Sequence, residues 1–225
     1  VLLLLMTLAV GWCNVAFVLA VLDGTVVRVL LLFYLSPLWA LVLGWVFLRE
    51  HPGSSGLLVF LLAIAGAVTM LWDAEMGMPW PRDAADWLAV SSGLAFAFSN
   101  VMVRKMPGVS VQTKSAATWL GVVLVAGVWI ALADVAVPRV ALSTWAGAAV
   151  LGWFGFFVMS LAVIYGVSRM PVHRSAVILL FELVVGAVSS LLLTDEQVLL
   201  QEWLGGALIL VAAYLAAHAH VREQR

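Results

Sequence analysis

The sequence predicts an all-α transmembrane protein, because of its composition and the length of its apolar runs. Hydrophobic residues make up 65% of the 225 residues, charged residues make up 10%, and the mean hydropathy is +1.14. Soluble globular domains, by contrast, contain about 25% charged residues. A helix that crosses the hydrocarbon core of a bilayer needs about 20 apolar residues, and the runs reach this length. A lipid bilayer is therefore the expected surrounding of the chain.

Eight such runs can be counted, and charged residues with Gly or Pro interrupt the chain between them. The predicted spans are residues 1–22, 25–48, 54–72, 86–105, 113–133, 142–168, 171–193 and 200–219. The interruptions are, in order, Asp23-Gly24, Arg49 to Gly53, the loop from Asp73 to Asp86, Pro107-Gly108, Asp134 to Arg139, Arg169 to Pro171, and Thr194 to Glu196.

The basic residues predict how these spans are oriented, since cytoplasmic loops are enriched in Lys and Arg. One set of alternate loops holds only Arg28, Arg82 and Arg139. The other set is expected to face the cytoplasm, together with the C-terminus of a multi-pass protein in the cell (inner) membrane. Its basic residues are Arg49, Arg104, Lys105, Lys114, Arg169, Arg174, Arg222 and Arg225.

One acidic residue, Glu182, falls near the middle of the predicted span 171–193. A carboxylate inside the hydrocarbon region costs about 3 kcal/mol or more unless it is paired or hydrated, so such residues usually mark a pathway. Glu182 is expected to pair with the ammonium group of an amino-acid-like substrate or to exchange a proton. The alternative is a protonated acid that bonds to a neighbouring helix. Gly186, one turn later, is a candidate hinge.

Three further polar residues are candidates for a substrate pathway. Asn14 lies on one helical face with Thr7 and Gly11, and Ser92 and Ser99 share a stripe of their helix. Tight helix packing would account for Gly11. Asn14 is expected to serve either a substrate or a neighbouring backbone. The serines either contact a substrate or bond to carbonyl groups of their own helix.

An aromatic face and a proline complete the candidates. Trp153, Phe156 and Ser160 share one face of the sixth span and could line a cavity for an aromatic or cationic solute; the alternative is ordinary packing. Pro37 is expected to bend its helix and free a backbone carbonyl, as a gating hinge or as a static kink.

The chain contains a weak internal similarity. Residues 23–50 align with residues 169–196 at an offset of 146, which matches Arg28 with Arg174 and Glu50 with Glu196. The first segment enters from the outside and the second from the inside. The two would therefore be inverted repeats, which are typical of transporters that bind substrate near the membrane midplane. Glu50 and Glu196 end their helices, where capping or a salt bridge with a loop arginine would explain them.

Four stretches carry a resemblance to a known family. They are Tyr34 to Glu50 followed by Gly56 to Leu71, and Phe181 to Glu196 followed by Gly205-Gly206. They resemble the fourth, fifth, ninth and tenth helices of EamA-type members of the drug/metabolite transporter superfamily, and Arg104-Lys105 after Asn100 resembles the end of the sixth. The spacing of thirteen residues between Pro37 and Glu50 is typical of that family. This chain has Leu183 where the family often has proline, so the resemblance does not imply a kink beside Glu182.

The resemblance implies a ten-helix bundle of two inverted five-helix repeats that exports amino acids or related small metabolites. On this map the chain begins at the third helix and lacks the first two, which leaves a cavity wall incomplete. Residues 1–72 are then the remainder of the first repeat, residues 86–220 the second repeat, and residues 221–225 a cytoplasmic tail.

Other functional classes find less support in the sequence. A membrane-embedded enzyme is the main alternative. The chain, however, has no HExxH or GxSxG motif and no cluster of His with carboxylates in the spans, and its single cysteine, Cys13, cannot form a cysteine pair. No metal or cofactor is expected, and the scattered basic residues predict no nucleic-acid partner. A non-transporting membrane subunit or a truncated copy remains a further alternative.

Overall fold

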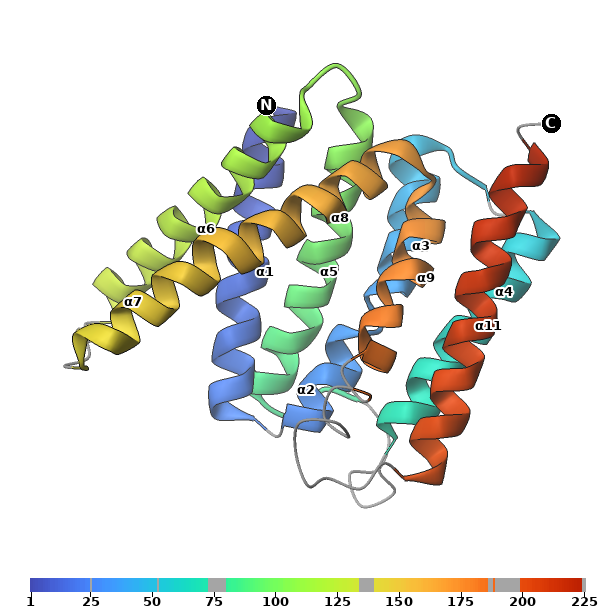
Figure 1. Cartoon of the computed structure of the whole chain (residues 1–225), viewed down its shortest axis with the longest axis horizontal. Helices are drawn as coiled ribbons and strands as arrows, with labels where there is room; N and C mark the ends of the chain where they lie inside the picture. The colour runs from blue at the N-terminus through green and yellow to red at the C-terminus, as the bar shows by residue number, and fades with distance from the viewer. Residues whose placement is uncertain are drawn as a thin grey trace.

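The computed structural model describes residues 1–24, 26–51, 53–72, 80–133, 140–185, 188 and 199–223, and its regular elements there are all helices (Figure 1). The all-α prediction is confirmed. The elements are α1 (Leu2–Asp23), α2 (Val26–Phe33), α3 (Ser36–Leu48), α4 (Ser54–Leu71), α5 (Ala84–Lys105), α6 (Val111–Leu132), α7 (Leu142–Val150), the π-helix η2 (Leu151–Phe156), α8 (Phe157–Arg169), α9 (Val172–Leu179) and α11 (Leu200–Glu223).

Six helices in the described residues are long and apolar enough to cross a membrane. Of the eight predicted spans, 171–193 and 200–219 are not confirmed. The first is described only at 171–185 and 188, and α9 within it is short; the second lies in α11, whose apolar part is Trp203–Leu215. The six helices that have the length and apolarity of a span are Leu2–Asp23, Arg28–Leu48, Ser54–Leu71, Ala84–Lys105, Val111–Leu132 and Leu142–Arg169.

The bundle has two ends, which we name by their ion pairs. The Glu50 end holds Glu50 and Arg104, the N-terminus and the α8–α9 junction, and the Arg28 end holds Arg28 and Asp86 (Figure 1). The described basic residues divide between these ends as the sequence predicts. Which end faces the cytoplasm stays a prediction.

The span around Pro37 is broken into α2 and α3 by a turn at Tyr34 and Leu35. Proline has no N–H to donate to the carbonyl of Phe33, four residues earlier, and it disfavours helical geometry in the residue before it. That carbonyl instead packs on α5, where a Cβ on Gly93 would lie 2.9 Å from the Phe33 oxygen. The predicted bend is present, and its freed carbonyl faces α5.

A second break follows α9, although no proline is present. The helix ends at Leu179, Leu180 forms a turn, and residues 181–185 are helical again. The Leu183 N–H donates to the Leu180 carbonyl at 3.1 Å, a tighter turn than that of an α-helix. Leu180 lies 146 residues after Tyr34. The two breaks therefore coincide in the alignment of residues 23–50 with residues 169–196.

Two helix pairs pack at very short range through glycines. In α1 and α6, a Cβ on Gly11 would overlap the carbonyl oxygen of Gly121. In α4 and α11, a Cβ on Gly66 would lie 2.8 Å from the carbonyl oxygen of Gly205. Such contacts are a main source of helix association where lipid removes the hydrophobic driving force. The packing predicted for Gly11 is thus confirmed.

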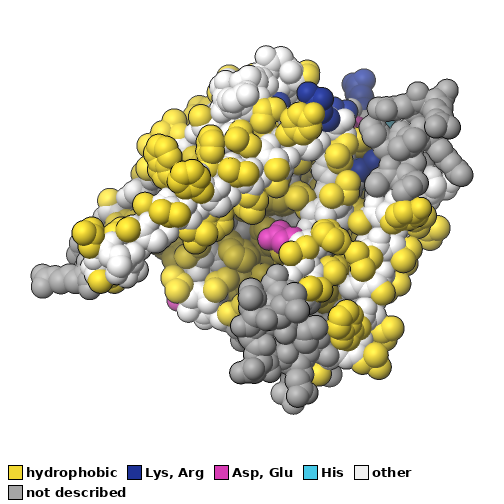
Figure 2. Space-filling view, viewed as in Figure 1, with side chains coloured by type: hydrophobic (Ala, Val, Ile, Leu, Met, Phe, Trp, Pro, Cys, Tyr) yellow, Lys and Arg dark blue, Asp and Glu magenta, His cyan; other side chains and the backbone are white. Residues whose placement is uncertain are grey.

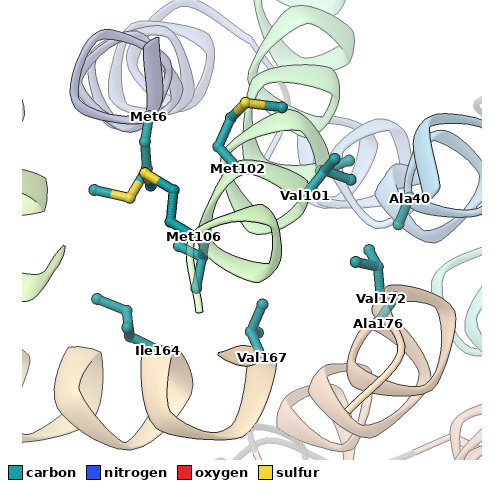
Figure 3. Close-up of a cluster of buried hydrophobic side chains, with 11 residues drawn as sticks. Met6, Ala40, Val101, Met102, Met106, Ile164, Val167, Val172 and Ala176 are labelled. Carbon is teal, nitrogen blue, oxygen red and sulfur yellow. The ribbon is translucent and has the colours of Figure 1, made fainter. Parts of the chain in front are cut away.

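The described apolar core forms three clusters that divide along the bundle. One at the Glu50 end joins α1, α3, α5, α8 and α9, and Figure 3 shows Met6 beside Met106 and Val172 beside Ala40. A second joins α4 and α11 to α9 and the following segment. The third, at the Arg28 end, contains Ala20, Val29, Leu32 and Ala89 and joins only α1, α2 and α5.

The helix from α7 to α8 is buried only along its last turns. None of residues 142–156, all of which the structure describes, is buried, whereas Ile164 and Val167 near the Glu50 end are buried. In Figure 1 this helix runs obliquely away from α5 toward the far end of α6. Figure 2 shows the surface hollowed beneath it.

Candidate functional site

Glu182 lies in the short helical stretch after the second break, and its side chain is exposed. Leu180 and Leu183 on either side are buried against α4 and α11, so the carboxylate is held on the opposite face of this segment. Figure 2 shows an acidic side chain among hydrophobic ones at the hollow of this face. An acid in such surroundings favours a partner that carries positive charge or donates a hydrogen bond.

The side chain that interacts with Glu182 is that of Tyr34, at the first break. Its hydroxyl donates a hydrogen bond to the carboxylate. The Tyr34 ring packs on the same apolar cluster as Leu180 and Leu183, and it meets the Phe33 ring edge-on at 5.3 Å. The two helix breaks, distant in sequence, thus bring a hydroxyl and a carboxylate together. Sequence reasoning missed Tyr34, although its place three residues before Pro37 was a signal.

The other polar candidates bond chiefly to backbone. The exposed Asn14 amide donates to the Val10 carbonyl of its own helix at 3.0 Å. The Ser99 hydroxyl donates to the Phe96 carbonyl at 2.7 Å, which is the expected alternative of a bond to a carbonyl group of its own helix. Ser92 instead bonds across to α1, donating to the Cys13 carbonyl at 2.8 Å. Ser92 and Ser99 are buried, whereas the side chain of Asn14 is exposed.

The aromatic candidates divide into a packed and an open group. Ser160 accepts a hydrogen bond from the indole of Trp119 at 3.0 Å, and its hydroxyl lies 3.1 Å from that of Ser115, so it joins α8 to α6. Phe156 lies against the Trp119 ring. Trp153, in the π-helical segment, is 80% exposed. Single π-helical turns often mark functional positions.

Not all the candidates are brought together. In the described part of the chain, the recorded partner of Glu182 is Tyr34, whereas Phe156 and Ser160 contact α6 and Ser92 contacts α1. Pro37 sits close to Tyr34 and sets the break there. Gly186 lies outside the described residues.

Charged residues form a network at each end that sequence reasoning found only in part. The predicted role of Glu50 is confirmed, because its carboxylate pairs with Arg104 and accepts the N–H of Val172 at the start of α9. The buried pair of Arg28 and Asp86, at 2.8 Å, was not anticipated. Their separation of 58 residues left no local pattern to detect it.

Comparison with known proteins assigns the chain to a family. A family model described as the EamA-like transporter family matches residues 83–217. One solved crystal structure resembles the fold with a TM-score of 0.69 and 17% sequence identity, over 96% of this chain and 88% of the other. No curated protein matches the chain. Because the family match covers more than half of the sequence, the chain belongs to the EamA-like transporter family.

Proposed function

We propose that this membrane transporter carries a small solute with an ammonium group, such as an amino acid or a related metabolite, by alternating access. The single observation that carries the proposal is the exposed Glu182 carboxylate, which lies between apolar helices at a helix break and faces Tyr34. An exposed carboxylate in apolar surroundings binds a cation more strongly than it would in water.

Glu182 can also bind a proton, and the two ligands would exclude each other. A carboxyl group that is protonated can no longer attract an ammonium group, so loading the proton releases the substrate. Exchange at one carboxylate would thereby couple export to the proton gradient. Tyr34 supports this role, because its hydroxyl can donate to the charged form.

We further propose that the Glu50 end faces the cytoplasm of the cell membrane. This rests on Arg49, Arg104, Lys105 and Arg169, which stand at the ends of α3, α5 and α8. The direction from the Glu50 end to the Arg28 end is then the direction of export.

The test is a metabolite export screen in cells that express the wild-type chain or Glu182→Gln. Glutamine keeps the size of the side chain but carries no charge and accepts no proton, so export and its pH dependence should be lost while the protein still folds. Asp23→Asn is the matched control, because Asp23 is an exposed acid at the end of α1. Wild-type export with wild-type pH dependence in Glu182→Gln would refute the proposal.

A further inference from the structure

The carboxylate of Glu50 joins three helices at one end of the bundle. It directly follows α3 and Arg49, which has a left-handed backbone with φ of 56°. Oε1 accepts from Nε of Arg104, at the end of α5, at 3.3 Å. Oε2 accepts from the backbone N–H of Val172, in the first turn of α9, at 2.8 Å. A carboxylate is favoured there by the positive end of the α9 dipole.

Two cations extend this network to α6 and α8. Arg104 donates to the carbonyl of Ser168 near the end of α8 at 3.1 Å. The ammonium group of Lys114, a residue that is 1% exposed, donates to the Val103 carbonyl of α5 at 2.8 Å and to the Ser168 hydroxyl at 3.2 Å. Both cations therefore cap the C-terminal ends of helices, where the dipole favours positive charge.

Apolar packing closes the same end. The cluster drawn in Figure 3 places Val101, Ala40 and Val172 of α5, α3 and α9 together, and Val167 is the labelled residue of α8 nearest to them. Packed side chains and the polar network thus both fill the space between the helices at the Glu50 end.

The opposite end is joined less completely in the described residues. The ion pair of Arg28 and Asp86 ties α2 to α5, the cluster that includes Val29 adds α1, and the Gln201 amide joins α11 to the end of α4 by donating to the Trp72 carbonyl at 2.9 Å. The α7 and η2 segments have no buried residue, and the hollow of Figure 2 lies beneath this helix. The contacts between α9 and α5 or α3 therefore concentrate at the Glu50 end.

We propose that Glu50 is the latch of a gate at this end, and that its contacts with Arg104 and Val172 break when the transporter opens there. The inference rests on the proposed alternating access. Glu50 is the side chain that connects α3 and α5 to the start of α9, the helix that leads to Glu182. Lys114 connects α6 to α5 and α8 and is not part of the latch.

The gate can be tested by labelling, without any knowledge of the solute. Cys13 is the single cysteine of the chain, so Cys13→Ser followed by Ala176→Cys gives one reporter in the closed core between α9 and α3. A membrane-impermeant maleimide is applied from each side of the membrane in vesicles of both orientations. With Glu50 intact, the reporter should be labelled slowly from the Glu50 end.

Glu50→Gln should raise the labelling rate from that end by about five- to tenfold, since it removes the charge of a partly buried ion pair. Arg104→Gln should have the same effect, and the double variant should add little, because the two residues act as a unit. Both single variants are measured, so that one that fails to fold leaves the other as the test.

The control variant is Asp83→Ala, which removes the cap at the other end of α5, where the Asp83 carboxylate accepts the N–H of Asp86 at 2.9 Å. It should lower thermal stability without raising the labelling rate. Unchanged labelling in Glu50→Gln and Arg104→Gln would overturn the latch and leave a static brace. That result would leave the proposal for Glu182 unaffected, because that proposal is tested by the export of Glu182→Gln.

Discussion

Gly11 of α1 and Gly121 of α6 meet backbone to backbone. A Cβ atom on Gly11 would overlap the Gly121 carbonyl, and one on Gly121 would overlap the carbonyl of Thr7. Gly127, two turns later in α6, has nothing within 4 Å of such an atom. The same helix thus offers a glycine that is required for packing and one that is not.

Gly121→Ala should lower the free energy of unfolding in detergent by about 1–3 kcal/mol, because α1 must move away from α6. Gly127→Ala should leave it unchanged or raise it by up to about 1 kcal/mol, since alanine is the better helix former. Thermal melts of the two variants side by side would check this. Equal melting temperatures would show that α1 and α6 do not cross at Gly121.

Adjacent glycines in α11 make the same comparison at the contact with α4. A Cβ on Gly205 would lie 2.5 Å from the Gly66 carbonyl oxygen, whereas one on Gly206 would make an ordinary contact with Val184 at 3.8 Å. Gly205→Ala should therefore cost about 1–3 kcal/mol and Gly206→Ala should cost little. A larger loss of stability in Gly206→Ala, measured by the same melts, would place α11 in a different rotation against α4.

Asp86→Ala should be among the most destabilising single changes in α5. Asp86 is 2% exposed and Arg28 is 8% exposed, and both carboxylate oxygens of Asp86 accept from Nε of Arg28. Removing one partner leaves a buried charge, which costs about 3 kcal/mol. Replacing both by apolar residues should cost less than Asp86→Ala alone. A double-mutant cycle on unfolding free energies would measure this, and strict additivity would contradict a buried pair.

The features that sequence could predict are those with a local signal. Hydropathy located six helices that are long and apolar enough to cross a membrane, because crossing a bilayer requires one continuous apolar run. Gly11 signalled close packing, and Pro37 signalled a break, because each constrains its own backbone. Glu50 was expected to cap or pair because it ends a helix, and the structure adds that the helix it caps is α9.

The features that sequence missed depend on partners far along the chain. Arg28 and Asp86 are 58 residues apart, and neither reveals the other. The break at Leu180 has no proline, so the sequence carries no local signal for it. Tyr34 gains its role only because that break brings Glu182 to it. In an apolar chain nearly every face is hydrophobic, so periodicity does not tell which face meets a helix and which meets lipid.

Pro37→Ala tests whether the proline sustains the site at Tyr34 and Glu182. Alanine restores an N–H that can bond to the Phe33 carbonyl, which favours one continuous helix in place of α2 and α3. Stability should change by no more than about 1 kcal/mol, because the new hydrogen bond offsets the added freedom of the unfolded chain. Export should fall, since straightening turns the Tyr34 hydroxyl away from Glu182. Export and stability both equal to wild type would show that packing of Phe33 on Gly93 holds the break without the proline.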